Sequence, residues 1–407
     1  DDRSWTIVST PHTVELMPAE ASGCRNYQGP AWYRKHFVLP AETKGKRVLI
    51  HFEAAMGKQV LYLNGKRIQE HVGGYLPFTL DLTTNGIQAG DSCLLAIFVD
   101  NSNDKSFPPG KPQYTLDFAY HGGIYRDVWM IAKSPVSITD PLDSQTVAGG
   151  GVFVHFDKIS EKSAQVYVNT ELQNDNQHTE TVTVETTLTD ADGKVIKRTS
   201  GKLSLKSGEK KIIRQQIEVK SPKLWSPDAP YLYKVQSRIK KGNQSIDGGI
   251  TRIGIRLAEF RGKDGFWLNG KPFVQLVGAN RHQDFAYVGN ALPNSQQWRD
   301  AKRLRDAGCT IIRVAHYPQD PSFMDACDEL GMFVIVATPG WQYWNKDVKF
   351  GELVHQNTRE MIRRDRNHPS VLMWEPILNE TRYPLDFALK ALEITKEEFP
   401  YPGRPVA

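Results

Sequence analysis

Four short apolar runs alternate with four amphipathic segments in residues 253–407, the last part of this 407-residue chain. The apolar runs predict strands and the amphipathic segments predict helices. The expected strands cover 273–277, 310–315, 333–337 and 370–374, and the expected helices cover 295–307, 320–330, 351–365 and 384–398. Ser295 stands at the N-cap position of the first helix, and Gly308 and Gly331 follow the first two helices as C′ residues. Four strand–helix pairs in succession predict a parallel sheet with helical crossovers, as in a (β/α)₈ TIM barrel.

Polar and aromatic side chains follow each of these four predicted strands. They are Asn280, Arg281, His282 and Asp284 after the first, His316 and Tyr317 after the second, Trp341, Tyr343 and Trp344 after the third, and Asn379 and Glu380 after the fourth. In a (β/α)₈ barrel the carboxyl ends of the strands surround the active site. We therefore expect these groups to meet at one mouth. Carboxylates, His, Asn and Trp together suit a carbohydrate ligand.

Glu380 is the leading candidate for a catalytic acid/base. We expect apolar walls around its side chain, which suits a proton donor. The alternative is that Asn379 and Glu380 begin a helix, where an acidic residue is favourable without any catalytic role.

Structural roles also stay open for other members of the set. His316 could be a turn histidine with its own hydrogen bonds, and Trp341 and Trp344 could pack beneath a loop. Arg281 could be an ion-pair partner as easily as a ligand. The histidines show neither H-x-x-x-H nor H-x-E spacing, and the four cysteines form no C-x-x-C pair, so we expect no metal and no cofactor.

Residues 1–133 alternate apolar and polar residues in many short runs separated by Gly, Asn and Pro, which predicts a jelly-roll β-sandwich. Asn64-Gly65 between two runs predicts a hairpin turn. Asp117 lies in a loop just before Gly122-Gly123, where it could face a ligand or cap its own backbone. Residues 134–252 alternate again and are rich in Thr and Val, which favours an immunoglobulin-like β-sandwich that spaces the flanking domains.

The composition argues against two kinds of partner. The net charge is +5 and no long Lys/Arg run is present, so we expect no binding to nucleic acid. No apolar stretch reaches about 18 residues, so we expect no membrane span. The chain opens with Asp1-Asp2-Arg3 and no apolar leader. Either it was never targeted or a signal peptide was removed; we expect a periplasmic or secreted protein, with the cytoplasm as the alternative.

Seven motifs taken in order resemble glycoside hydrolase family 2, which includes β-galactosidases, β-glucuronidases and β-mannosidases. They are Ala31-Trp-Tyr-Arg-Lys, Leu63-Asn-Gly-Lys, His121-Gly-Gly-Ile-Tyr-Arg-Asp, Asn280-Arg-His-Gln-Asp, Arg313-Val-Ala-His-Tyr-Pro, Arg366-Asn-His-Pro-Ser-Val-Leu-Met-Trp and Leu378-Asn-Glu. The resemblance runs over nearly the whole chain, in the order sugar-binding jelly roll, immunoglobulin-like sandwich, TIM barrel.

This resemblance implies a retaining mechanism with two carboxylates about 5–5.5 Å apart. Glu380 matches the acid/base of the family, and Asn379 matches the Asn that holds the 2-hydroxyl group of the sugar. His316, His282 and Asp284 match residues at the glycone. Asp117 matches an acidic residue that the jelly roll contributes to the same pocket.

Two departures from the family pattern matter. Residues 337–341 read Ala-Thr-Pro-Gly-Trp, where magnesium-dependent β-galactosidases carry an acidic residue and a His, so we do not expect that magnesium site. The family's Asn-Arg-His-Glu motif has Gln283 in its fourth place, which weakens assignment to one named activity.

Residues 253–407 are also too few for a complete barrel of about 250 residues. We therefore expect the amino-terminal half of a barrel, a nucleophilic Glu that lies beyond Ala407, and a fragment that is inactive alone. The expected function is that of a retaining exo-β-glycosidase of the β-galactosidase type that acts on terminal β-linked sugars, with a homo-oligomer possible. The alternatives are a β-glucuronidase or β-mannosidase of the same family, or a carbohydrate-binding fragment without catalysis.

Overall fold

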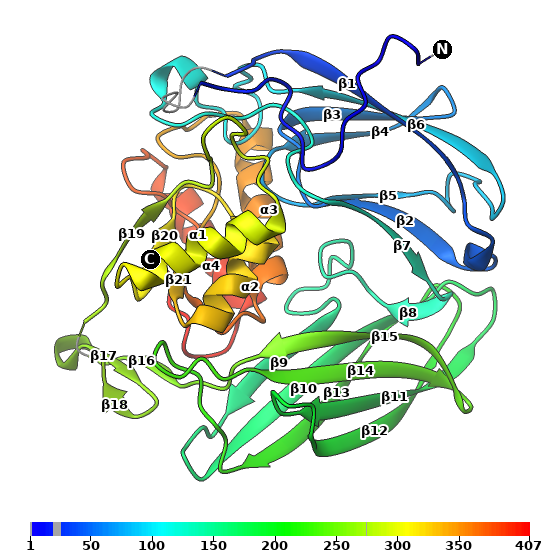
Figure 1. Cartoon of the computed structure of the whole chain (residues 1–407). Helices are drawn as coiled ribbons and strands as arrows, with labels where there is room; N and C mark the ends of the chain where they lie inside the picture. The colour runs from blue at the N-terminus through cyan, green and yellow to red at the C-terminus, as the bar shows by residue number, and fades with distance from the viewer. Residues whose placement is uncertain (1, 19–25, 274) are drawn as a thin grey trace.

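The computed structural model describes residues 2–18, 26–273 and 275–407. Two β-sandwiches lie one beyond the other, and a part built of parallel strands and helices packs beside both of them (Figure 1). We call these the first sandwich (strands β1–β7), the second sandwich (β8–β15) and the α/β part (β16 to α4). The domain boundaries after residues 133 and 252 stay predictions.

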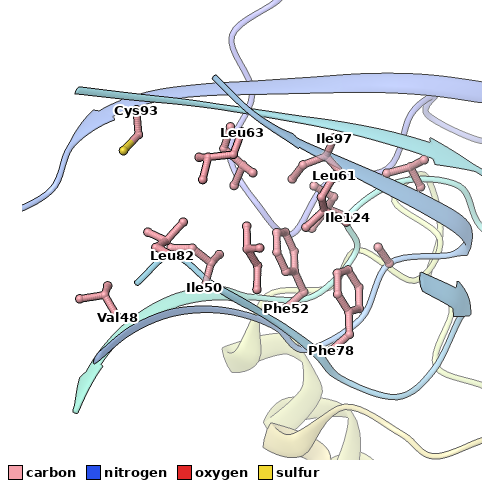
Figure 2. Packing of buried hydrophobic residues seen from close by; sticks show 14 of the residues in the cluster. Val48, Ile50, Phe52, Leu61, Leu63, Phe78, Leu82, Cys93, Ile97 and Ile124 are labelled. Carbon is pink, nitrogen blue, oxygen red and sulfur yellow. The ribbon is translucent and has the colours of Figure 1, made fainter. Parts of the chain in front are cut away.

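The first sandwich has two sheets, with strand orders β1-β6-β3-β4 and β5-β2-β7. The strands are β1 (Pro30–Val38), β2 (Arg47–Phe52), β3 (Gly57–Leu63), β4 (Lys66–Gly73), β5 (Phe78–Asp81), β6 (Ser92–Asp100) and β7 (Val128–Lys133). Figure 2 shows Phe52 and Phe78 of one sheet facing Leu61 and Ile97 of the other. The predicted hairpin turn between β3 and β4 is confirmed, because Asn64 and Gly65 both have positive φ angles, 50° and 82°.

The second sandwich also has two sheets, β13-β10-β8, with β9 paired to β10, and β12-β11-β14-β15. The strands are β8 (Val136–Ile138), β9 (Val152–Asp157), β10 (Ser163–Asn174), β11 (Glu180–Thr189), β12 (Val195–Leu205), β13 (Lys210–Lys220), β14 (Tyr233–Lys241) and β15 (Gln244–Ile253). Its alternating pattern places Val166, Val168 and Val235 in a buried core while the intervening residues face outward.

The α/β part begins with a small antiparallel sheet, β16-β17-β18, and continues with a parallel sheet in the order β19-β20-β21-β22. The strands are β16 (Ala258–Phe260), β17 (Phe266–Leu268), β18 (Lys271–Pro272), β19 (Gly278–Arg281), β20 (Ile311–Val314), β21 (Phe333–Ala337) and β22 (Val371–Glu375). The helices are α1 (Asn294–Asp306), α2 (Pro321–Leu330), α3 (Val348–Asp365) and α4 (Leu385–Glu398). The predicted alternation of strands and helices is confirmed.

The first strand of the parallel sheet was predicted in the wrong place. We expected it at 273–277, but β19 begins at Gly278. The backbone N–H of Phe273 instead donates to the carbonyl of Phe266 at 2.8 Å, which extends the small antiparallel sheet. Gly278 approaches β20 so closely that an added Cβ atom would lie 1.7 Å from the carbonyl oxygen of Ile311. Phe273 and Leu276 pack against the cluster around Phe333, Val277 is exposed, and a glycine begins the strand.

The helix boundaries follow ordinary capping chemistry. Asp320 caps α2, since its side chain accepts a hydrogen bond from the Ser322 N–H. The two predicted C′ glycines have left-handed backbones, with φ of 94° at Gly308 and 75° at Gly331. The prediction of Ser295 as the N-cap of α1 was wrong, because the N-cap is Pro293 and Ser295 already lies in the helix.

Beyond β22, an isolated parallel bridge joins Trp374 to Val406 on the side opposite β21. In the part of the chain that the structure describes, no helix combines the length and the apolar character that a membrane crossing requires.

Candidate active site

Three aromatic side chains from successive strand ends meet at the carboxyl edge of the parallel sheet. His316 follows β20 and stacks on Trp341, which follows β21, with ring centroids 4.7 Å apart and ring planes 4° apart. His282, after β19, lies 5.7 Å from His316 between centroids. Phe118 of the first sandwich closes the group at 4.6 Å from His282 and 6.1 Å from Trp341. The structure therefore brings together side chains that the sequence placed after three separate strands. We call the site formed by His282, His316, Trp341 and Phe118 the mouth.

Glu380 lies on the loop after β22 and its side chain is exposed. Its carboxylate accepts a hydrogen bond from the side-chain amide of Gln342, on the loop after β21. The expectation of apolar walls around Glu380 was wrong for the described residues. The reason is that β22 already ends at Glu375, so the following loop carries Glu380 outward beyond the end of the sheet.

A partly buried ion pair supports the loop that carries Glu380. Arg313 of β20 reaches across β21 and donates to both carboxylate oxygens of Glu375, at 2.8 Å from Nε and 2.6 Å from Nη2. The same Nη2 donates to Oδ1 of Asn379 at 2.9 Å. A two-point bond between Arg and a carboxylate fixes both groups in orientation, so the position of Asn379 is tied to two strands.

The first sandwich contributes charged groups to this mouth. The Lys111 ammonium nitrogen lies 4.4 Å from the centroid of the Trp341 ring and donates to the side-chain oxygen of Gln342. Burial lowers the pKa of Lys111, while the negative charges of Asp117 and Glu380 oppose this shift. The exposed Asp117 therefore lies close enough to act on the same ammonium group as Glu380.

The two histidines of the mouth are neutral at pH 7. Burial lowers the pKa of His316 to about 3, and the positive charge of Arg313 adds to this effect. Burial also lowers the pKa of His282, although the carboxylates of Asp284 and Asp117 oppose the shift. Nδ1 of His316 is buried and has no hydrogen-bond partner among the described residues. A neutral imidazole offers one donor and one acceptor, which suits sugar hydroxyl groups.

Trp344 does not join the ring group around His316. It packs instead against Phe350, Tyr383 and Phe387, with its ring centroid 4.4 Å from that of Phe387. This is the packing role that the sequence left open for it. Trp344 also lines a groove of about 710 Å³ between the first turns of α3 and α4.

One group of side chains among the described residues has the composition of a metal site. It consists of Asp325, Asp328 and His368, whose ligand atoms lie within 4.8 Å of one another. Asp328 already accepts bonds from His368 and from the N–H of Ser370, and Asp325 pairs with Arg252. The bonds of Asp328 hold α2 to the start of β22, at the amino edge of the sheet and away from the mouth, and the Asp325 pair holds α2 to β15.

Sequence reasoning missed Arg313, Glu375, Lys111 and Gln342 as parts of this site. A signal existed for the first two, because each is a lone charged residue in an otherwise apolar strand and such charges are buried in pairs. Lys111 and Gln342 gave no local signal, since their contact joins residues 231 positions apart.

The fold and the mouth define a class of protein, in which a parallel α/β sheet and a β-sandwich together form one open site. Three family models match nearly the whole chain. "Glycosyl hydrolases family 2, sugar binding domain" matches residues 4–135, "Glycosyl hydrolases family 2" matches 150–256, and "Glycosyl hydrolases family 2, TIM barrel domain" matches 260–406. The chain belongs to glycosyl hydrolase family 2.

Individual relatives agree with this family but differ in activity. A β-galactosidase from Thermoanaerobacter pseudethanolicus is 36% identical over 97% of this chain and 50% of the relative. A β-glucuronidase from Formosa agariphila is 32% identical over 92% of this chain and 39% of the relative. The crystal structure of a Bacteroides uniformis β-glucuronidase matches with a TM-score of 0.87 and 30% identity, over 100% of this chain and 49% of that chain. The chain thus spans about half the length, or less, of these relatives.

Proposed function

We propose that the chain forms the sugar-binding and acid-bearing part of a retaining exo-β-glycosidase that removes terminal β-linked sugars, of the β-galactosidase type. The observation that carries this proposal is the convergence of His282, His316 and Trp341 at the carboxyl edge of the sheet, beside the loop that presents Glu380. The first sandwich contributes Asp117 to the same mouth. Family membership and the β-galactosidase relative support the same function.

In this proposal Glu380 donates a proton to the glycosidic oxygen and later accepts one from the attacking water. Asn379, fixed by Arg313, bonds the 2-hydroxyl group of the sugar. The neutral imidazoles of His282 and His316 bond other hydroxyl groups of the glycone. Trp341, packed against His316 and Lys111, forms a wall of the glycone site, and Trp344 packs away from it against Phe387.

A retaining mechanism also needs a nucleophilic carboxylate about 5–5.5 Å from the acid. Glu375 is unsuited to this role because both of its carboxylate oxygens are bonded to Arg313. We propose that the nucleophile is supplied by a further strand of a TIM barrel that these 407 residues do not contain. The 407-residue chain alone is then expected to bind sugar without turnover.

The test measures hydrolysis of aryl β-galactosides by the protein as its gene encodes it. Glu380→Gln removes the proton donor, so kcat/KM on poor leaving groups is expected to fall at least about 100-fold. The loss on a highly activated leaving group such as dinitrophenolate should be far smaller, because that group departs without protonation. Glu397→Gln, an exposed acid on α4, is the control. Equal small losses on both substrates would remove Glu380 from this role.

A β-glucuronidase is the second candidate, and the ammonium group of Lys111 at the mouth favours it because a uronic acid carries a carboxylate. Two of the relatives described above are β-glucuronidases. Comparing kcat/KM for p-nitrophenyl β-galactoside, β-glucuronide and β-mannoside decides among the three glycones. Binding without turnover of any of them, in the protein as its gene encodes it, would favour a carbohydrate-binding role instead.

We also propose a periplasmic or secreted setting, which cell fractionation of the source organism tests directly.

A further inference from the structure

We infer that Lys111 and Gln342 position Glu380 for proton donation, so that a loop of the first sandwich controls the acid of the α/β part. This inference rests on the proposed function and adds two positioning residues to it. Neither residue reacts. Each acts through the orientation of the Glu380 carboxyl group.

The first link is between the two loops that follow β21 and β22. Gln342 makes two bonds across this gap: its side-chain amide donates to Oε2 of Glu380, and its backbone N–H donates to the hydroxyl oxygen of Thr381 at 2.9 Å. A single residue thus holds both the carboxyl group and the backbone beside it.

The backbone at both ends of this bond is unusual. Gln342 has a φ of 56° and Glu380 a φ of 60°, in the left-handed region that residues with side chains rarely adopt. Such conformations persist only where surrounding contacts hold them, and they gather at functional sites. The two residues that share the hydrogen bond are therefore the two strained residues of these loops.

The second link sets the orientation of the amide. The ammonium group of Lys111 can only donate hydrogen bonds, and it donates to Oε1 of Gln342. With Oε1 held in this way, Nε2 must face Glu380 as a donor. The ring face of Trp341, 4.4 Å from the ammonium nitrogen, holds the cation in place. Without Lys111 the amide is free to turn and present its oxygen to the carboxyl group.

The bond from Gln342 occupies Oε2 of Glu380 and leaves Oε1 without a hydrogen bond among the described residues. A proton on Oε1 is then available to the glycosidic oxygen. As the bond between the anomeric carbon and this oxygen breaks, the proton moves to the leaving group and Glu380 becomes a carboxylate. The amide of Gln342 stabilises the negative charge on Oε2 at that moment.

The experiment uses the protein as its gene encodes it and compares aryl β-galactosides with poor and with activated leaving groups. Lys111→Met and Gln342→Leu are each expected to lower kcat/KM, which reports the proton-donating first step, about tenfold on the poor leaving group. On the activated leaving group the loss of kcat/KM should stay below about twofold, because that group departs without protonation. Lys111→Arg keeps the donor and should restore most of the activity.

Two further variants control for the loss of a nearby positive charge and for misfolding. Lys105→Met changes a lysine that lies six residues earlier, is exposed, and makes no side-chain bond among the described residues, so both activities should stay at the parent level. Gln342→Glu keeps the size of the side chain and its bond to Lys111 but has no N–H to donate. It should match Gln342→Leu in leaving-group dependence even if Gln342→Leu folds poorly.

Equal losses on both leaving groups, or no loss in any variant, would overturn the positioning role. The two proposals fail in different ways. If Glu380→Gln shows no leaving-group dependence, the proposed function fails. If that dependence is present but Lys111→Met and Gln342→Glu behave like the parent protein, only the positioning inference fails.

Discussion

At the scale of single residues, the mouth depends on buried groups whose charge state is fixed by their surroundings. The ring of His316 is stacked on Trp341, and burial lowers its pKa to about 3. In the unfolded chain a histidine has a pKa near 6.5. Between these two values the unfolded chain binds a proton that the folded chain does not, so the free energy of unfolding falls as the pH falls from about 6.5 towards 3.

Replacing His316 should therefore weaken the acid sensitivity of the fold. One histidine contributes at most about 1.4 kcal/mol per pH unit in this window. His316→Phe keeps an aromatic ring against Trp341 but cannot titrate. Urea unfolding at several pH values between 7 and 4 should show a shallower decline than in the parent protein. Part of the decline should remain, because burial lowers the pKa of His71 and His155 to about 4 as well. Parallel curves would contradict the prediction.

The sequence could predict which kinds of side chain gather at the mouth but not how they are arranged. His282, His316 and Trp341 follow predicted strands, so the topology of parallel strands places them at one edge. The exposure of Glu380 could not be predicted, because it depends on where β22 ends and how the next loop turns. The Lys111 contact depends on how the first sandwich and the α/β part pack against each other, which no local pattern encodes.

At the scale of elements, the ends of strands and helices follow signals that the sequence carries. Strand β21 lies where the apolar run predicted it, and a glycine in the left-handed region terminates each of α1 and α2. The misplaced first strand shows the limit of such signals. An apolar run predicts burial but does not say where a strand begins. Here the close approach of Gly278 to Ile311 sets the start of β19.

The two C′ glycines give a matched test of local strain against tertiary contact. An added Cβ atom at Gly308 meets nothing within 4 Å, whereas at Gly331 it would lie 2.2 Å from the carbonyl oxygen of Pro227 in the second sandwich. Gly308→Ala should lower the free energy of unfolding by about 1 kcal/mol, from the backbone alone. Gly331→Ala should cost about 3 kcal/mol, because it also forces the sandwich away. Chemical denaturation measures both; equal losses would show that the Pro227 contact is unimportant.

At the scale of the whole molecule, polar side chains that cross between parts hold the sandwiches to the sheet. Arg126 of the first sandwich is fully buried and donates to the side-chain oxygen of Gln283 at 3.1 Å and to the carbonyl of Pro318 at 2.8 Å. Asn367 serves the second sandwich in the same way, with bonds to Val152 and Val154. The alternation of each part was predictable from its own sequence, but these contacts arise only when the parts meet.

Removing the Arg126 guanidinium should loosen the first sandwich from the sheet. Arg126→Met leaves two buried acceptors of the α/β part unpaired, and the Asp320 carboxylate, 3.8 Å away, loses its cation. We expect a loss of about 3 kcal/mol in the free energy of unfolding, measured with urea. Arg198→Met, on an exposed edge of the second sandwich, is the control and should change it by less than about 0.5 kcal/mol. A loss below 1 kcal/mol for Arg126→Met would show that the docking does not depend on it.

The mouth lies on the seam between the first sandwich and the α/β part, which share a buried apolar cluster with Tyr75 and Phe118 on one side and Tyr317 on the other. The ring centroids of Phe118 on one side and His316 on the other lie 6.1 Å apart, so we expect a ligand in the mouth to contact both parts. Ligand binding therefore stabilises the packing of the two parts, because its free energy adds to that of the contacts between them. Under the proposed function, changes confined to a loop of the first sandwich would alter which sugar binds, while the sheet that precedes Glu380 keeps its shape.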